Sequence, residues 1–296
     1  MRKSNFTDSG FLKIRTILII GGFLGFSSVS FAQKATLNVL TYNIRLANPN
    51  DAPNTWANRK ENVFSVIRQA TPDVFGLQEA LKEQVADIEK AFPGFTLIGV
   101  GRDDGKDAGE FSPVFYNSKK YILISSGTFW LSQTPTVAGS RGWDAACNRV
   151  VSWVQLKDKK SDARFFVFCT HFDHMGEIAK RNSAKLLLHA ADSLAGYKPA
   201  VVMGDFNAVP YSEPYKIITD FSNRSHLTDA RLICNDNKGP EYTFTGFKVG
   251  GEQGGRIDYI FLKNNVQVLT FNVNETNIGG YYPSDHLPVN AKLKIY

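Results

Sequence analysis

Short stretches in which apolar and polar residues alternate recur along the chain, and this two-residue period predicts β-strands. The first predicted strand covers residues 36–44, and the second covers residues 73–79. The apolar run at residues 200–203 predicts a buried strand, which Gly204 ends. Further strands are predicted at residues 95–100, 112–117, 121–130, 149–156, 164–170, 257–262, 266–273 and 287–295, with short elements at 227–230 and 241–245.

Apolar residues spaced three or four positions apart predict three amphipathic helices. The first ends before Pro72, the second covers residues 81–92, and the third covers residues 175–194. Because paired strands with short turns outnumber the helices, the pattern favours antiparallel or mixed sheets over a doubly wound parallel sheet. No repeat, low-complexity tract or linker divides residues 33–296, so we expect one α+β domain there.

The N-terminus has the pattern of a secretory signal peptide. Basic residues precede an apolar run at residues 16–26, which is too short to favour a membrane-spanning helix. Ser30 and Ala32 then place small residues before a cleavage site. We expect residues 1–32 to be removed and the mature protein to be exported to the periplasm or the medium. An uncleaved membrane anchor is the alternative.

Charge and cysteine content change this picture only slightly. The whole chain has a net charge of +6, but the chain after residue 32 has 30 basic and 27 acidic residues, a net of +3. Charge alone therefore does not indicate nucleic-acid binding. The three cysteines, Cys147, Cys169 and Cys234, lack the spacing of a metal site, and Cys169 lies in an apolar run that favours a buried free thiol.

Polar residues suited to metal or phosphate chemistry follow many of the predicted strands. Asp205 and Asn207 come directly after one strand, and the period of a strand directs both side chains to the same side of the sheet. Asn43, Glu79 and His171 also end predicted strands, whereas Asp258 lies inside one and Asp285 and His286 precede the last one. Taken singly, each has an ordinary structural explanation, such as an ion pair between Asp258 and Arg256. Together, carboxylates crowded at one rim repel one another unless a cation neutralises them.

These residues offer oxygen ligands and imidazoles but no thiolate cluster. This set of ligands favours Mg²⁺ or Mn²⁺ over structural zinc. Mg²⁺ typically takes one or two carboxylates, keeps several waters and contacts substrate phosphate oxygens. A metal ion with an Asp/Asn pair and a histidine therefore suits in-line attack of water on a phosphoester.

Six motifs, in one order, resemble the endonuclease/exonuclease/phosphatase superfamily over residues 36–296. They are Asn43, Leu77-Gln78-Glu79, Thr170-His171, Gly204-Asp205-Phe206-Asn207, Arg256-Ile257-Asp258 and Ser284-Asp285-His286. The resemblance implies an α+β fold, a four-layer α/β/β/α sandwich of two mixed β-sheets with outer helices. It also implies a phosphohydrolase that depends on Mg²⁺, with Mn²⁺ as the alternative metal.

The resemblance implies a role for each matching residue. Glu79 would be the principal metal ligand, with Asn43 beside it, and Asp285 would be a second ligand to metal or water. Asp205 would orient or deprotonate the attacking water. Asn207 would hold a phosphate oxygen as negative charge builds on it.

The histidines receive roles from the same resemblance. His286 would contact the phosphate or act as an acid or base, with Asp258 buried behind it to fix its tautomer. His171 would be another phosphate contact.

Residues outside the six motifs are candidates for substrate binding. Arg149 opens a predicted strand, where it would clamp a phosphate bidentately or form a surface ion pair. Asp173 and His174 follow His171 closely and would line the rim of the site. Glu110 and the Trp143-Asp144 pair lie in glycine-rich loops of the kind that border such pockets.

The motifs define the reaction more sharply than the substrate. The turn at residues 204–215 looks most like that of the deadenylases, whereas the signal peptide argues against a cytosolic mRNA substrate. We expect a phosphodiesterase or nuclease acting on a phosphoester in a nucleic acid, a nucleotide or a lipid head group. The alternatives are a phosphomonoesterase, a lipid-head-group phosphodiesterase and a binding module that has lost catalysis. No stable protein partner is implied, and we expect a monomer.

Overall fold

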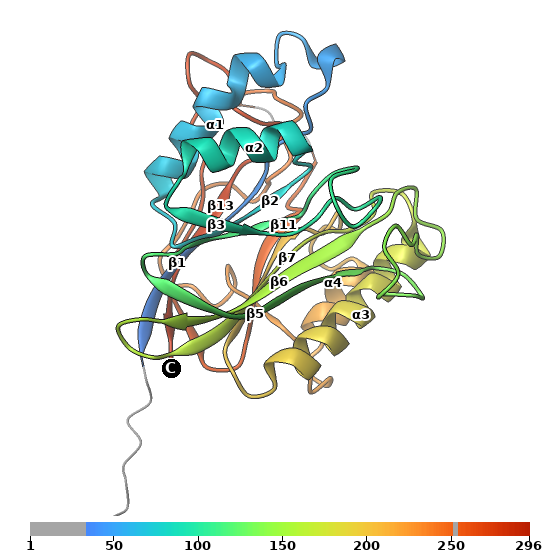
Figure 1. Cartoon of the computed structure of the whole chain (residues 1–296), viewed down its shortest axis with the longest axis vertical. Helices are drawn as coiled ribbons and strands as arrows, with labels where there is room; N and C mark the ends of the chain where they lie inside the picture. Colours follow the sequence, from blue (N-terminus) through green and yellow to red (C-terminus); the bar gives the residue numbers. More distant parts are fainter. Residues whose placement is uncertain (1–33, 251–253) are drawn as a thin grey trace, which may run out of the picture. The chain divides into compact units, whose positions relative to one another are not determined.

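Two β-sheets and four α-helices make up the described part of the computed structural model, residues 34–250 and 254–296 (Figure 1). The seven-stranded sheet has the order β10-β12-β13-β1-β2-β4-β3, and the six-stranded sheet has the order β5-β6-β7-β8-β11-β9. The strands are β1 (Ala35–Asn43), β2 (Val74–Gln78), β3 (Phe95–Ile98), β4 (Val114–Asn117), β5 (Tyr121–Trp130), β6 (Val150–Asp158), β7 (Arg164–His171), β8 (Ala200–Asp205), β9 (Thr228–Asp229), β10 (Asn237–Lys238), β11 (Asp258–Lys263), β12 (Val266–Val273) and β13 (Val289–Ile295). The helices are α1 (Trp56–Ala70), α2 (Lys82–Ala91), α3 (Glu177–Ala195) and α4 (Glu213–Thr219), with a 3₁₀ helix at Pro49–Asp51.

Both sheets are mixed, and each has a parallel strand pair near its centre. In the seven-stranded sheet, β1 is parallel to β2 and antiparallel to β13. In the six-stranded sheet, β7 is parallel to β8 and antiparallel to β6. The mixed sheets predicted from the sequence are therefore confirmed.

The apolar run of β8 is continuous because this strand is buried on both faces. Val201 and Met203 lie in the core shared by the two sheets. Ala200 and Val202 lie in a second core that includes Leu187 of α3 and residues of α4. A strand covered on both faces has no reason to alternate apolar with polar residues.

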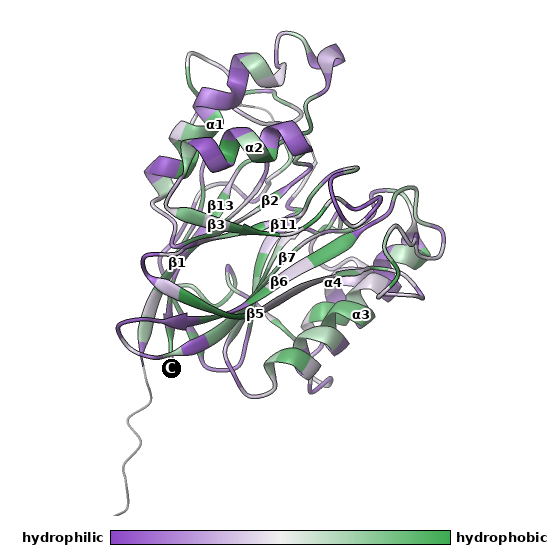
Figure 2. Cartoon of the chain, viewed as in Figure 1, coloured by the Kyte–Doolittle hydropathy of each residue, from purple (hydrophilic) through white to green (hydrophobic). Residues whose placement is uncertain are grey.

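Two helices cover the outer face of each sheet. Val63 of α1 and Val85 of α2 share a third core with Phe75 of β2. Figure 2 shows hydrophilic and hydrophobic residues mixed along α1 and α2, as expected for helices with one buried face. Together with the cores on either side of β8, this arrangement confirms the predicted four-layer α/β/β/α sandwich.

The structure differs from the prediction at two places. Residues 241–245, predicted as a short element, make only one isolated bridge, between Phe244 and His286, before Gly246 turns the chain at a φ of 58°. Helix α4 was not predicted, because its seven residues give too few turns for a periodic pattern. The sequence signals for this helix were Pro214 in the first turn and the apolar residues Tyr215 and Ile218, which the structure shows to be buried.

The predicted signal peptide, residues 1–32, lies outside the described residues. Within the part of the chain that the structure describes, no helix combines the length and the apolar character needed to cross a membrane.

The central strands of both sheets end in polar residues. Asn43, at the end of β1, is in register with Gln78, which directly precedes Glu79. In the other sheet, Asp205 at the end of β8 is in register with His171 on one side and Asp258 on the other. Strand pairing, parallel for β1 with β2 and for β7 with β8 and antiparallel for β8 with β11, thus brings residues that are distant in sequence to one edge of each sheet.

Gly204 permits the close approach of β7 and β8 just before Asp205. Its φ is 149°, and a Cβ atom there would lie 2.0 Å from the carbonyl oxygen of Thr170. That contact involves backbone and not a mobile side chain, so either β7 or β8 would have to shift.

We predict that Gly204→Ala lowers the free energy of unfolding by at least about 2 kcal/mol, because it adds backbone strain to a steric clash. Urea unfolding of the purified protein measures this change. Gly94→Ala is the matched control, since nothing lies within 4 Å of a Cβ at that position. Equal stability of the two variants would contradict the proposed clash.

Candidate active site

A cavity of about 380 Å³ is lined by residues from the ends of these strands and from neighbouring loops. Most of the residues predicted for the site line it. They are Glu79, Arg149, His171, His174, Asp205, Asn207, Asp285 and His286. The remaining three predicted residues, Asn43, Asp173 and Asp258, are buried and hydrogen-bond to residues of the cavity wall.

Glu79, Asp205 and His286 form the chemical centre of the cavity. Each offers one ligand atom, and the three atoms lie within 4.8 Å of one another. Behind them, the side-chain nitrogen of Asn43 donates to Oε1 of Glu79 and to Oδ2 of Asp205, both at 3.0 Å. In this orientation Asn43 holds the two carboxylates together and does not present an oxygen to a metal ion.

Burial makes the negative charge of this centre unfavourable. The pKa of Asp205 is raised to about 7, first by loss of solvent and then by the charge of Asp258, while His286 opposes the shift. Burial also raises the pKa of Asp285, and the charge of Glu79 adds to that effect. Buried carboxylates with raised pKa values and a donor set of oxygen and imidazole nitrogen fit a hard divalent cation.

His286 is oriented by a buried carboxylate. Its Nδ1 lies 2.8 Å from Oδ2 of Asp258, and its Nε2 lies 3.8 Å from Oδ2 of Asp205. The pKa of His286 is raised well above its usual value, because the attraction of Asp258 and Asp205 exceeds the effect of burial. Arg256, which the sequence offered as the partner of Asp258, pairs instead with Asp229 at 2.8 Å.

His171 and Asn207 lie side by side on another part of the wall. The side-chain nitrogen of Asn207 donates to the carbonyl of Phe172 at 3.0 Å and lies 3.1 Å from Nε2 of His171. Burial, reinforced by the nearby positive charge of Arg149, lowers the pKa of His171 well below its usual value. A neutral imidazole that accepts from Asn207 through Nε2 carries its proton on Nδ1.

Arg149 is a buried guanidinium with spare hydrogen-bonding capacity. Its Nε lies 3.4 Å from Asp173, and its Nη2 lies 3.0 Å from Nδ1 of His174. Its Nη1 is buried and has no hydrogen-bond partner among the described residues. Because Arg149 lines the cavity, this nitrogen is suited to a substrate oxygen.

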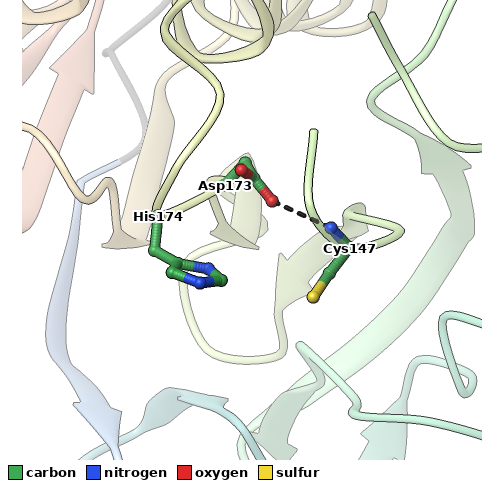
Figure 3. A group of neighbouring side chains, drawn as sticks. All are labelled: Cys147, Asp173 and His174. Atoms are coloured by element: carbon green, nitrogen blue, oxygen red, sulfur yellow. Dashed lines mark hydrogen bonds between the residues drawn. The ribbon is translucent and has the colours of Figure 1, made fainter. Parts of the chain in front are cut away.

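Asp173 is not free to contact substrate, which corrects its predicted role. It is 1% exposed, and its carboxylate accepts hydrogen bonds from the backbone nitrogens of Ala146, Cys147, Met175 and Gly176. Figure 3 shows the bond to Cys147 beside the side chain of His174. These four bonds hold the pKa of Asp173 far below its usual value. They also occupy the lone pairs that Asp173 would need to bind a metal ion together with Cys147 and His174.

Among the residues of the cavity wall that sequence reasoning missed are Arg45, Arg102 and Phe244. Arg45 lies two positions after Asn43, and its guanidinium is 3.7 Å from Glu79 and 3.8 Å from Asp285. Its closeness in sequence to the strand end was the only signal for it. Phe244 lies in the stretch predicted only as a short element, and its ring lies 5.1 Å from that of His286.

We predict that Asp205→Asn stabilises the metal-free protein above pH 7. The folded pKa of about 7 exceeds the unfolded value of 3.8, so the wild type loses stability as the pH rises from about 4 to 7. The gain is at most about 4 kcal/mol, which is the full conversion of the pKa shift. Urea unfolding in EDTA at several pH values measures it.

The same substitution at the exposed Asp236 is the control and should leave the pH dependence unchanged. If Asp205→Asn and the wild type lose stability in parallel between pH 4 and 8, Asp205 is not the group that titrates.

Known proteins share both the sequence motifs and the fold of this chain. Residues 40–286 match the sequence model of the endonuclease/exonuclease/phosphatase family. A crystal structure of an endonuclease/exonuclease/phosphatase from Bacteroides vulgatus is 39% identical, with a TM-score of 0.85, and the match covers 88% of this chain and 100% of that one. Both findings confirm the resemblance deduced from the six motifs.

Two further relatives differ in how much of their length is matched. The mannosyl-6-phosphatase Bt3783 of Bacteroides thetaiotaomicron is 35% identical, with a TM-score of 0.81, over 87% of this chain and 99% of that one. Mouse Nocturnin is 26% identical over 78% of this chain, but the match spans only 57% of Nocturnin.

Proposed function

The chain belongs to the endonuclease/exonuclease/phosphatase family of metal-dependent phosphoric ester hydrolases, and we propose that it is an exported, Mg²⁺-dependent hydrolase of small phosphomonoesters such as sugar phosphates. The observation that carries the proposal is the convergence of Glu79, Asp205 and His286 within 4.8 Å in one cavity. Residues separated by more than 200 positions in sequence meet there in the arrangement that in-line attack on a phosphoester requires.

The residues present fit a metal ion next to the phosphate. When bound by Glu79 and Asp285, Mg²⁺ supplies charge neutralisation at the phosphate oxygens. The donor set supports Mg²⁺ or Mn²⁺, since it contains carboxylates and no thiolate. Arg45, which lies between the two carboxylates, limits the negative charge of the site before the metal binds.

Asp205 is the group placed to activate water. Its ionised carboxylate, held by Asn43 and by the backbone nitrogen of Asn207, suits a general base. Water attacks phosphorus and gives up a proton to Asp205, while the bond to the leaving-group oxygen breaks. The products are inorganic phosphate and an alkoxide, which takes a proton from solvent to become the alcohol, and Asp205 then returns its proton to solvent. The protonated His286, held by Asp258, donates to a phosphate oxygen and stabilises the charge that builds on it.

The positive side of the cavity supports a monoester dianion. Arg149 offers its unpartnered Nη1, and His174 lies beside it at the rim. A cavity of about 380 Å³ suits a small ligand better than a polynucleotide, which needs an extended basic groove. The relative named as a mannosyl-6-phosphatase, 35% identical over nearly its full length, supports the same substrate class.

Removal of the metal should abolish activity, and removal of His286 should nearly do so. We expect EDTA to stop hydrolysis of mannose 6-phosphate by the purified mature protein and Mg²⁺ to restore it. His286→Ala should lower kcat by about 10²–10⁴, as for loss of acid–base help, whereas His189→Ala on the exposed part of α3 should not. Released phosphate is the readout.

Assays of the same protein on other substrates, each following its own product, separate the alternatives. Faster cleavage of DNA, RNA or bis-p-nitrophenyl phosphate than of sugar phosphates would favour the phosphodiesterase predicted from the sequence. Faster release of phosphocholine from sphingomyelin would favour a lipid head group. Turnover that persists in Asp205→Ala would point to a contaminant and to a binding module without catalysis.

Export rests on the signal peptide pattern at residues 1–32. We expect the protein recovered outside the cytoplasm to begin at Gln33, as determined by N-terminal sequencing. Ala32→Arg should block cleavage, because the position before the scissile bond requires a small residue. Recovery of a full-length chain from the membrane fraction of the wild type would favour the uncleaved anchor.

A further inference from the structure

The loop between β3 and β4 carries an ion pair in the wall of the cavity. Nη1 of Arg102 lies 2.6 Å from Oε2 of Glu110, and the two side chains are only 13% and 15% exposed. Both residues line the same cavity as Glu79 and Asp205. The mechanism of phosphate hydrolysis assigns no role to this pair.

The loop is fixed and not a mobile flap. The backbone nitrogen of Arg102 donates to the carbonyl of Glu110 at 3.1 Å, and the indole of Trp130 donates to the carbonyl of Arg102 at 2.7 Å. The next residue, Phe111, donates to the carbonyl of Ala80, directly after Glu79. The ion pair is thus held in a defined position beside the metal-binding carboxylate.

The pair has hydrogen-bonding capacity that the protein does not use. The ion pair joins Nη1 of Arg102 to Oε2 of Glu110, so Nη2 of Arg102 and Oε1 of Glu110 lie outside this bond. Nε of Arg102 is buried without a hydrogen-bond partner among the described residues, although it lies 4.0 Å from the carboxylate of Asp103. An acceptor and a donor fixed side by side in a cavity wall are suited to two neighbouring hydroxyl groups, because one hydroxyl donates to the carboxylate and the other accepts from the guanidinium.

The position of the pair relative to the reactive centre fits a leaving group. Nε2 of His171 lies 3.4 Å from Oδ2 of Asp205, and Nδ1 of the same ring lies 3.8 Å from Oε2 of Glu110. The carboxylate of Glu110 is therefore separated from Asp205 by one imidazole ring, in a part of the same cavity that could receive the alcohol portion of a phosphoester. The ring of Phe244, partly exposed in the same cavity, offers an apolar face to carbon-bound hydrogens.

We propose that Arg102 and Glu110 form a hydroxyl-recognition subsite that selects phosphoesters of polyols, such as hexoses, over those of simple alkyl or aryl alcohols. The inference rests on the proposed function and adds the residues that choose the leaving group. A cavity built to bond a hydroxyl discriminates strongly against a ligand that lacks it, because the buried polar groups then lose their partners.

The test compares kcat/KM for mannose 6-phosphate with that for n-butyl phosphate, which has no hydroxyl groups. We expect the wild type to prefer the sugar phosphate by at least about 100-fold. Glu110→Leu should reduce this ratio at least about tenfold, and Glu110→Gln should reduce it less, because the amide oxygen still accepts a hydrogen bond. Glu110→Gln also serves if the leucine variant fails to fold.

Glu241→Gln is the matched control, because Glu241 forms an ion pair of the same 2.6 Å length with Arg231 outside the cavity. If both Glu110 variants keep the wild-type ratio, or lose kcat/KM equally on both substrates, the proposed subsite is wrong and the ion pair is only structural. If the wild type hydrolyses neither substrate with Mg²⁺, the proposed function itself fails.

Discussion

Negative charge buried where the central strands end is the constraint on which the rest of the site depends. Glu79 and Asp205 are close enough for one amide, that of Asn43, to donate to both. A fold that confines carboxylates in this way must supply positive charge or let them bind protons. The chain does both in part, through His286 and through the raised pKa of Asp205, and a divalent cation would complete the neutralisation.

The site residues that could be predicted from the sequence are those at the ends of strands. Asp205, Asn207 and His171 directly follow apolar runs, so period and burial were enough to identify them. The order of the motifs added Asp258 and His286, whose contact across 28 positions no local pattern would reveal. The layers of the fold were also predictable, because helices and strands with a buried face show long periodic or continuous apolar patterns in the sequence.

The rest could not be predicted, because it depends on loops whose conformation has no periodic signal. Arg45 and Arg102 reach the cavity from irregular segments, where a lone arginine resembles any surface residue. Asp173, in contrast, was predicted to contact substrate because it lies near His171 in the sequence. In the structure its carboxylate oxygens instead accept hydrogen bonds from backbone nitrogens of two loops. Such bonds depend on tertiary folding, which brings residues 146 and 173 together.

Arg59 ties two halves of the chain together behind the metal-binding side. From α1, its guanidinium donates to the carbonyls of Ile44 and Arg45 and, at 3.2 Å, to that of Pro283. The loop with Glu110 is anchored on the same side of the cavity, since Phe111 donates to the carbonyl of Ala80, next to Glu79. Arg59 itself does not line the cavity. A substitution at Arg59 would therefore disturb the site from behind, through the backbone, with every cavity side chain unchanged.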